Sequence, residues 1–435
     1  MSRTKRNAVL ALAVAAAVTA PGAFASVGYF SHGYSMIEKG MAGTGVAFAQ
    51  DSLAAITNPA GMVLVGNRMD GGVSLFSPMR EYSTTSCVGA GCAPPSFPIA
   101  PYAGGTVESD NSIFLVPSFG ANWMLDANSS AGFDLYVNGG MSTMWKAGDT
   151  GGPGVYSGAY SGGDGTAGVY LGQVFLSGTY ARKITPTSSW GASLIYAYQR
   201  FKAHGLEAFK GFSSDPDNVT NNGNAYSTGF GYKLGAQGEV SPGVSFGASY
   251  QGQISMSEFD RYKGLFAEQG GFDIPATATA GLAWKTSPAT VLTFETQRIW
   301  FSKVKSVGNT MMPGLMTSML GNSNGAGFGW QDIDIYRLGY QWESGPGMTW
   351  RAGYIKNDQP IPSSEVLFNI LAPGVQTQHF TFGLTKQMDK NNDLTFAAMY
   401  SPEETVSGPN PLSPGQNIEL RMKQYDLGLA WGRKF

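Results

Sequence analysis

Few side chains in this sequence could perform catalysis. A serine hydrolase would need His32, His204 or His379 as its general base, because these are the three histidines of the chain. None of them sits in a nucleophile motif of the Gly-x-Ser-x-Gly type. A Gly-Lys-Ser/Thr loop that would cradle the phosphates of a nucleotide does not occur either. We therefore expect no enzymatic activity, no cofactor and no nucleotide-driven step.

The two cysteines, Cys87 and Cys92, occur in Thr-Ser-Cys-Val-Gly-Ala-Gly-Cys-Ala-Pro-Pro. A zinc site would need further ligands, and no histidine or acidic residue lies nearby in the sequence. The N-terminal residues, described next, indicate an exported chain. Such a chain meets an oxidising compartment, where closely spaced cysteines form disulfides. We predict a local disulfide between Cys87 and Cys92 and no metal site.

Residues 1–25 have the features of a secretory signal peptide. A basic start with Arg3, Lys5 and Arg6 precedes an apolar run over 8–20. The small-residue site Ala23-Phe24-Ala25 follows, so cleavage after Ala25 is predicted. An uncleaved anchor is the alternative, but the run is shorter than the roughly 20 apolar residues that span a bilayer.

The composition disfavours a soluble enzyme or a nucleic-acid-binding protein. Only 13% of the residues are charged, whereas soluble domains carry about 25%. The chain has 60 Gly together with 9 Trp, 20 Tyr and 25 Phe, which suits a sheet with small side chains on one face and large apolar ones on the other. The net charge of −2 provides no basic surface for nucleic acid.

From about residue 66 onward, segments alternate between large apolar and small or polar residues. In the segment 422–435 the apolar positions are Tyr425, Leu427, Leu429, Trp431 and Phe435, and the intervening ones are Asp426, Gly428, Ala430, Gly432 and Lys434. A period of two gives a strand with two different faces. Large aromatic residues on one face indicate lipid outside, and small polar residues on the other indicate a lumen.

About fourteen such segments can be counted, which is typical of a bacterial outer-membrane barrel with an even strand number. They lie near 66–80, 112–125, 131–145, 168–183, 188–203, 226–240, 243–257, 272–285, 290–304, 331–343, 347–357, 376–387, 392–401 and 421–435. Short turns alternate with long loops at 81–111, 204–225, 305–330 and 403–419. A soluble β-sandwich also alternates, but it does not sort its turns by length in this way. We predict an all-β membrane protein with a fourteen-stranded antiparallel transmembrane barrel over 66–435.

Residues 26–65 do not follow the strand pattern. The segment 36–56 is rich in Ala and Gly at helix-compatible spacing, and Asn58-Pro59-Ala60-Gly61 is predicted to end it. The segment is either a periplasmic arm or a compact plug inside the barrel, and composition alone leaves both open.

The sequence resembles the FadL/TodX family of outer-membrane transporters. The resemblance rests on Ser31-His-Gly-Tyr-Ser-Met-Ile-Glu-Lys-Gly-Met-Ala-Gly-Thr-Gly-Val-Ala-Phe-Ala and Asp51-Ser-Leu-Ala-Ala-Ile-Thr-Asn-Pro-Ala-Gly. Further along, Ile274-Pro-Ala-Thr-Ala-Thr-Ala-Gly-Leu-Ala-Trp and Trp350-Arg-Ala-Gly-Tyr-Ile-Lys-Asn-Asp-Gln-Pro-Ile-Pro match in the same order. The resemblance covers essentially the whole mature chain and says little about the exact substrate.

This resemblance implies a small helical N-terminal hatch over 26–65 that plugs the lumen. It also implies passive uptake of hydrophobic molecules, long-chain fatty acids or hydrocarbons, caught at the outer loops and held in a lumen pocket. The family's ligand leaves sideways through an inward kink of the third strand, which matches Asn138, Gly139 and Gly140 here. The hatch motif Asn58, Pro59 and Ala60 is expected to take part in gating.

Several residues are candidates for ligand binding. Phe30 is expected in the lumen pocket, and Arg337 and Arg351 lie on lumen-facing positions where either could hold a carboxylate. Alternatively, these arginines pair with lumen acids such as Glu295 or Asp334. The outer-loop candidates for a capture surface are Phe209, Phe212, Leu265, Phe266, Met311, Met312, Leu315 and Met316. Ordinary loop packing would explain this last set as well.

The expected compartment is the outer membrane of a Gram-negative bacterium, with membrane lipid around a monomeric barrel. The terminal aromatic Phe435 resembles the signal read by the barrel-assembly machinery, which is therefore an expected partner. Two other functions stay open. A general diffusion porin would lack the plug, and an outer-membrane lipid hydrolase would need one of the three histidines.

Overall fold

A computed structural model describes residues 26–86, 104–146, 166–413 and 415–435. The predicted signal peptide and the predicted Cys87–Cys92 disulfide lie outside the described residues. Within the described ranges, no helix is long and apolar enough to cross a membrane.

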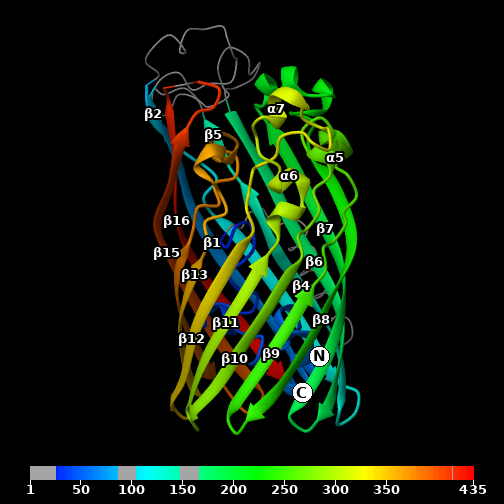
Figure 1. Cartoon of the computed structure of the whole chain (residues 1–435). Coiled ribbons are helices and arrows are strands. Elements are labelled where there is room, and N and C mark those ends of the chain that lie inside the picture. The colour runs from blue at the N-terminus through cyan, green and yellow to red at the C-terminus, as the bar shows by residue number, and fades with distance from the viewer. Residues whose placement is uncertain (1–25, 87–103, 147–165, 414) are drawn as a thin grey trace.

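Fourteen antiparallel strands close into a barrel, as the alternation predicted (Figure 1). The last strand pairs with the first along its whole length, from Arg68 opposite Lys434 to Thr84 opposite Ile418. The strands are β1 (Arg68–Thr84), β3 (Phe114–Met124), β4 (Ser129–Ser142), β6 (Thr166–Thr185), β7 (Ser188–His204), β8 (Ala225–Ser241), β9 (Val244–Gln251), β10 (Thr277–Ser287), β11 (Thr290–Ile299), β12 (Ile333–Gly345), β13 (Met348–Asn357), β14 (Gln378–Gln387), β15 (Asn392–Pro409) and β16 (Asn417–Lys434). Closure matters because an open sheet would leave a whole edge of backbone N–H and C=O groups without partners in the bilayer.

Two short strands extend the wall at the end that carries the long loops. One is β2 (Gly105–Glu108), which continues the line of β3 beside β1. The other is β5 (Trp145–Lys146), which continues the line of β4 beside β6.

Some strand ends differ from the sequence prediction. The strands predicted at 243–257, 272–285 and 290–304 are shorter, because the chain leaves the ladder after Gln251 and rejoins it at Thr277, and β11 ends at Ile299. The loop predicted at 403–419 is wrong. There, β15 and β16 continue their ladder to Pro409 opposite Asn417, after a bulge between Ser401 and Glu404 that shifts the alternation.

The loops at the outer end carry short helices. They are η3 (Glu207–Phe212), η4 (Pro216–Asn218), η5 (Asp260–Tyr262), α5 (Ala267–Gly270), η6 (Phe301–Lys303), α6 (Lys305–Gly308), α7 (Gly314–Thr317), η7 (Ser363–Glu365) and α8 (Val366–Asn369). Figure 1 shows them gathered at one end of the barrel, and the opposite end carries tight turns.

The outer surface of the barrel is a band of large apolar side chains. On β16, Leu427 and Leu429 are about half exposed while the preceding Asp426 is buried, which confirms the predicted faces. Exposed tryptophans lie near the short turns, at Trp123, Trp190, Trp284 and Trp431. Several exposed tyrosines lie farther along the strands toward the loops, at Tyr226, Tyr250, Tyr336, Tyr400 and Tyr425, whereas Tyr180 and Tyr340 lie beside tryptophans near the short turns. Such aromatic belts mark the two membrane–water interfaces of a barrel.

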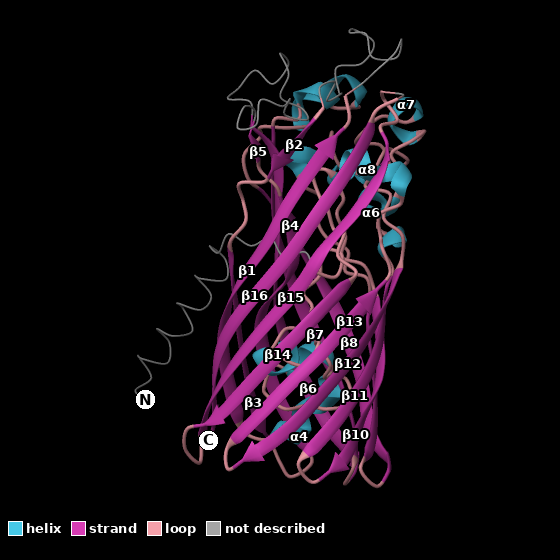
Figure 2. Ribbon diagram, turned by 90° about the vertical axis from the view of Figure 1, so that its left-hand side faces the viewer, coloured by secondary structure: helices cyan, strands magenta, loops and turns pink. Residues whose placement is uncertain are grey.

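The N-terminal residues form a plug inside the barrel (Figure 2). Its helices are α2 (Met36–Lys39), α3 (Ala54–Thr57), η1 (Pro59–Gly61) and α4 (Met62–Val65). The helix α3 ends at Thr57 as predicted, but Pro59 then begins a new helical turn, because its missing N–H costs nothing at that position.

Glycines of the barrel wall make room for the plug. A Cβ added at Gly235 would lie 1.9 Å from the Asn58 side-chain oxygen, and one at Gly247 would lie 1.9 Å from the Val46 carbonyl. Any other residue would displace the Asn58 side chain at the first position and the Val46 backbone at the second. The high glycine content is therefore used in part to seat residues 26–65, which we call the hatch.

Candidate ligand path

The chain after Ser26 lies along the inner part of β4. The Gly140 N–H donates to the Tyr29 carbonyl over 2.9 Å, and the Ser31 N–H donates to the Asn138 carbonyl over 3.2 Å. A Cβ at Gly139 would lie 2.0 Å from the Tyr29 oxygen, so this contact requires glycine. We call residues 26–31 the N-terminal arm.

The predicted interruption of the third strand is a bulge. The pairing of β4 with β6 shifts register between Val137 and Gly139. The Asn138 side chain at the bulge donates to Gln173 over 2.8 Å and meets the Tyr34 hydroxyl at 3.2 Å. Residues 134–142 are buried on both faces, unlike the alternating exposure of the other strands.

The pairing between β3 and β4 stops partway along the wall. It runs from Met124 opposite Ser130 to Ser118 opposite Tyr136, and β3 continues to Phe114 with β1 as its partner. Pro117, the next residue of β3, has no N–H to donate, and proline is tolerated at sheet edges for that reason. We call this unpaired stretch the β3–β4 interval.

A small hollow lies behind this interval. Val116, Pro117 and Val137 line it from the wall, and Tyr34 and Met36 line it from the hatch. The arrangement places a small space between the hatch and an interrupted part of the barrel wall.

An apolar pocket lies among the outer loops. Three of the predicted capture residues, Phe209, Leu265 and Phe266, line it. Val169 of β6 and Phe201 of β7 contribute from the wall, and the sequence analysis had singled out neither residue. Along the rest of its lining, the one polar side chain among the described residues is a serine. We call this space the upper pocket.

The loops around the upper pocket are tied together by polar contacts. Lys263 and Asp215 form an ion pair of 3.2 Å between the loops 252–276 and 204–225. A hydrogen bond from the Asn218 side chain, helped by Lys263, lowers the pKa of Asp215, so this carboxylate is ionised at neutral pH. The loops are therefore held in place around the pocket.

The other predicted capture residues do not line the upper pocket. Met311 and Leu315 are buried in the loop core, and Phe212 and Met312 pack against that core. Met316 is 48% exposed. Loop packing, the alternative considered for these residues, describes the first four of them but not the exposed Met316.

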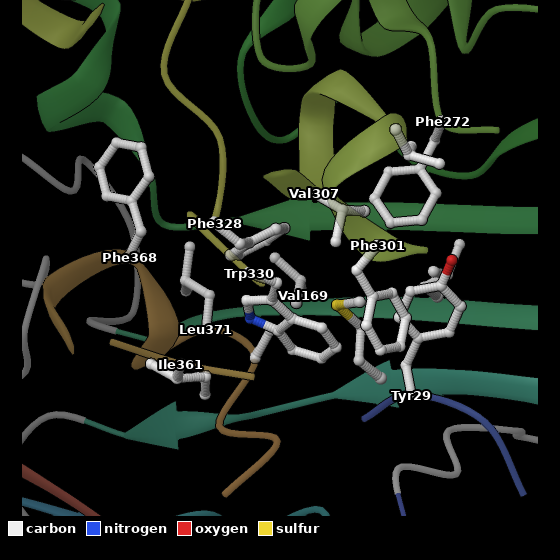
Figure 3. Close-up of a cluster of buried hydrophobic side chains, with 14 of the residues drawn as sticks. Tyr29, Val169, Phe272, Phe301, Val307, Phe328, Trp330, Ile361, Phe368 and Leu371 are labelled. Atoms are coloured by element: carbon white, nitrogen blue, oxygen red, sulfur yellow. The ribbon is translucent and has the colours of Figure 1, made fainter. Parts of the chain in front are cut away.

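Aromatic side chains continue from the upper pocket to the N-terminal arm (Figure 3). Phe328 and Leu371 line the pocket, and Trp330 follows toward the arm. The ring of Trp330 lies 5.1 Å from that of Phe301, and the Phe301 ring lies 5.3 Å from that of Tyr29. Sequence analysis assigned no role to either residue: Phe301 fell inside the strand predicted at 290–304 but begins the helical turn η6, and Trp330 lies in the loop before β12.

A second, more polar pocket lies below the arm. It brings together two predicted binding residues, Phe30 and Arg337, with Lys233 of β8 and Gln251 of β9. Arg337 also contacts Glu295 at 3.2 Å, which is the pairing considered as the alternative to ligand binding. We call this space the lower pocket.

Arg351, the other predicted carboxylate ligand, lies away from both pockets. Its guanidinium donates to Gln341 and Thr385 on the wall and to Gln50 of the hatch, at 2.8, 2.6 and 3.2 Å. Its contacts are those of a residue that holds the hatch in place.

The predicted hatch motif makes a dense set of hydrogen bonds. The Asn58 amide donates to the Val46 carbonyl over 2.6 Å and to the Ala236 carbonyl of β8 over 3.1 Å. The Asn58 side-chain oxygen accepts from the Ala60 N–H over 3.1 Å, which caps the turn begun by Pro59. The motif thus joins two hatch segments to the wall.

An ion pair also joins the hatch to the barrel wall. Lys39 of α2 contacts Asp426 of β16 at 2.6 Å, with both side chains buried. In the described part of the chain, no group of three or more His, Cys, Asp or Glu is placed to hold a metal ion.

A family model described as outer membrane protein transport protein (OMPP1/FadL/TodX) matches residues 13–424. The chain therefore belongs to this family of outer-membrane transport proteins. Comparison with curated protein sequences gives no match.

Solved structures with the same fold are distant in sequence. The toluene transporter TodX of Pseudomonas putida is 17% identical, with 93% of this chain and 99% of that chain covered and a TM-score of 0.64. A FadL homologue of Pseudomonas aeruginosa is 15% identical, with coverages of 94% and 100% and a TM-score of 0.66. The toluene transporter TbuX of Ralstonia pickettii is 17% identical, with coverages of 93% and 99% and a TM-score of 0.61.

Proposed function

We propose that this protein takes up hydrophobic small molecules, long-chain fatty acids or hydrocarbons, across the outer membrane by passive transport. The observation that carries the proposal is the apolar upper pocket, which continues as buried aromatic side chains down to Tyr29. An apolar solute gains about 25 cal/mol for each Å² that it removes from water, so such a pocket would concentrate it. Two structural neighbours, TodX and TbuX, are toluene transporters, which supports the same class of substrate.

The exit that we propose is the β3–β4 interval. Its cavity lies between the hatch and the interrupted wall, and the wall residues Ile113 and Leu115 beside it face outward. A solute that leaves here enters lipid directly and stays out of water. Passage through an aqueous lumen would instead forfeit the free energy of burial.

Uptake assays with radiolabelled oleate and toluene, in cells with and without the gene, test the proposal. We expect faster uptake of at least one of the two compounds in cells that carry the gene. Unchanged uptake of both, with faster entry of small sugars, would instead identify a general diffusion porin.

A pair of loop variants tests the upper pocket. Leu265→Glu places a carboxylate in the apolar lining, where a charge is poorly solvated, and we expect uptake to fall about tenfold or more. Met316→Glu introduces the same charge on an exposed loop residue outside the lining and is the matched control. Equal uptake by the two variants would contradict the assigned role of the upper pocket.

Maturation is part of the same proposal. We propose that the signal peptide is removed after Ala25, which would leave Ser26 as the first residue of the arm. Sequencing the N-terminus of protein purified from outer membranes checks this directly. A mature chain that still carries residues before Ser26 would contradict it.

A further inference from the structure

The carboxylate of Glu295 holds two parts of the molecule at once. One of its oxygens accepts hydrogen bonds from the Gly45 and Val46 N–H groups of the hatch, at 3.1 and 3.0 Å. The other oxygen contacts the Arg337 guanidinium at 3.2 Å. Both side chains are almost fully buried, Glu295 at 2% exposure and Arg337 at 5%.

Glu295 lies where the lower pocket meets the hatch. Arg337 and Glu295 both line that pocket, together with Phe30 of the N-terminal arm. The Arg337 Nε has no hydrogen-bond partner among the described residues, so this guanidinium keeps a free donor at the pocket. On the other side, the Val46 carbonyl accepts from Asn58, so the segment held by Glu295 is also tied to the hatch motif.

We propose that Glu295 is the latch that keeps the hatch closed, and that Arg337 links this latch to the lower pocket. Arg337 fixes the orientation of the carboxylate, and the oriented carboxylate fixes the Gly45–Val46 segment against the wall. A ligand group that accepts a hydrogen bond from Arg337 competes with Glu295 for the guanidinium. The carboxylate is then no longer held in the orientation that fixes the Gly45–Val46 segment. Glu295 is thus a positioning residue for transport, and this role rests on the proposed function.

The proposal requires Glu295 to be a carboxylate, because only a carboxylate has an accepting oxygen for each of its two partners. A carboxylate accepts on both oxygens and can serve the hatch and Arg337 together. The amide of glutamine has one accepting oxygen, and its NH₂ group can satisfy neither the hatch N–H groups nor the guanidinium. Glu295→Gln has the same shape but must give up one of the two partners.

Ion conductance of the purified full-length protein in planar lipid bilayers tests the latch without any hydrophobic cargo. We expect Glu295→Gln to raise the fraction of time in a conducting state about tenfold, the equivalent of one hydrogen bond to a charged group. Thr293→Val is the matched control. It removes the 2.8 Å bond between Thr293 and Thr44, a neutral link between the same strand and the neighbouring hatch residue.

Coupling to the lower pocket is tested with decanoate as the probe. We expect decanoate to raise the conductance of the unaltered protein and to leave that of Glu295→Gln unchanged, because the latch is already released. Glu295→Asp, which keeps the charge but is one methylene shorter, serves as a second variant if Glu295→Gln fails to fold, as judged by its heat-modifiable mobility on gels. We expect it to raise the conductance as well.

Two results would overturn the proposal. One is a conductance of the folded Glu295 variants equal to that of the unaltered protein. The other is an equal increase in Thr293→Val, which would show that any lost contact loosens the hatch. A failure of the proposed function would give a different result. The uptake assay would then show no effect of the gene, while the conductance of Glu295→Gln would still exceed that of Thr293→Val.

Discussion

At the scale of single residues, Gly139 shows how one missing side chain shapes the lumen. The Tyr29 carbonyl occupies the space where a Cβ would stand, at 2.0 Å. The arm can therefore follow the bulged part of β4 and bring Tyr29 and Phe30 into contact with Phe301. A glycine within a strand permits such a close backbone approach, and other residues do not.

Gly139→Ala should displace the N-terminal arm and reduce hydrophobic uptake several-fold while leaving a folded barrel. The reason is steric, since the added carbon and the Tyr29 oxygen cannot occupy the same space. Oleate uptake and heat-modifiable gel mobility measure the two effects. Gly178→Ala on β6 is the control, because a Cβ at Gly178 has no atom within 4 Å. Normal uptake by Gly139→Ala would show that the arm has no role in transport.

The contact of Arg337 with Glu295 could not be predicted from the position of either residue in the sequence. Its place on a small-residue face of its strand predicted that it points into the lumen, and it is buried there. Its contact with Glu295 depends on β11 lying next to β12 in one particular register, with Glu295 opposite Arg337. That register is fixed by the barrel and not by either residue.

At the scale of elements, the hatch is held by hydrogen bonds more than by its own helical stability. Each of its helices spans one turn, which is too short to be stable in isolation. The wall supplies the partners instead, among them the Ala236 carbonyl for Asn58 and the Asp426 carboxylate for Lys39. The hatch should therefore loosen when a single anchoring residue is removed.

Asn58→Ala should destabilise the hatch by about 1–3 kcal/mol, because it leaves buried backbone groups without partners. Hydrogen exchange of the amides around Val46 should then speed up while the barrel amides stay protected. Ser249→Ala, which removes one 2.7 Å bond to the Thr57 carbonyl, is expected to have a smaller effect. Equal protection of the hatch in Asn58→Ala and the unaltered protein would contradict this account.

At the scale of the whole molecule, the barrel is set by a closed ladder of strands and by its outer band of apolar side chains. The pairing of β16 with β1 closes the sheet, and the ladder is interrupted at the β3–β4 interval and beside the part of β8 that precedes Lys233. The C-terminal residue Phe435 is 49% exposed, and its ring lies 6.3 Å from that of Trp123 in the belt near the short turns. We propose that this exposed end is presented to the assembly machinery.

Phe435→Ala should lower the amount of protein that reaches the outer membrane several-fold. The folded fraction should keep its normal heat-modifiable mobility, because an exposed side chain contributes little to the packing of the barrel. Quantitative immunoblots of outer-membrane fractions measure the amount. Met388→Ala removes another exposed apolar side chain at the same end and is the control. Equal levels of the two variants would rule out a targeting role for Phe435.

The sequence by itself determined the barrel, because alternation is a local property that any strand reveals. The faces of β12 and β16, the fourteen strands and most turns could be read from residues close together in the chain. The bulge at Asn138 was also readable, since two glycines mark it. The loop predicted at 403–419 failed because the bulge after Ser401 hides the continuing strands.

Only the tertiary structure decided how the interior is arranged. Val169, Phe201, Trp330 and Tyr29 come from four separate segments, and no spacing in the sequence predicts that they share one apolar cluster. The same holds for Glu295, which meets Gly45 and Arg337 across 250 and 42 positions of the chain. Contacts within a lumen depend on how the strands are ordered around the barrel. Residues close together in the sequence therefore predict the membrane barrel, whereas the ligand path depends on residues that only the fold brings together.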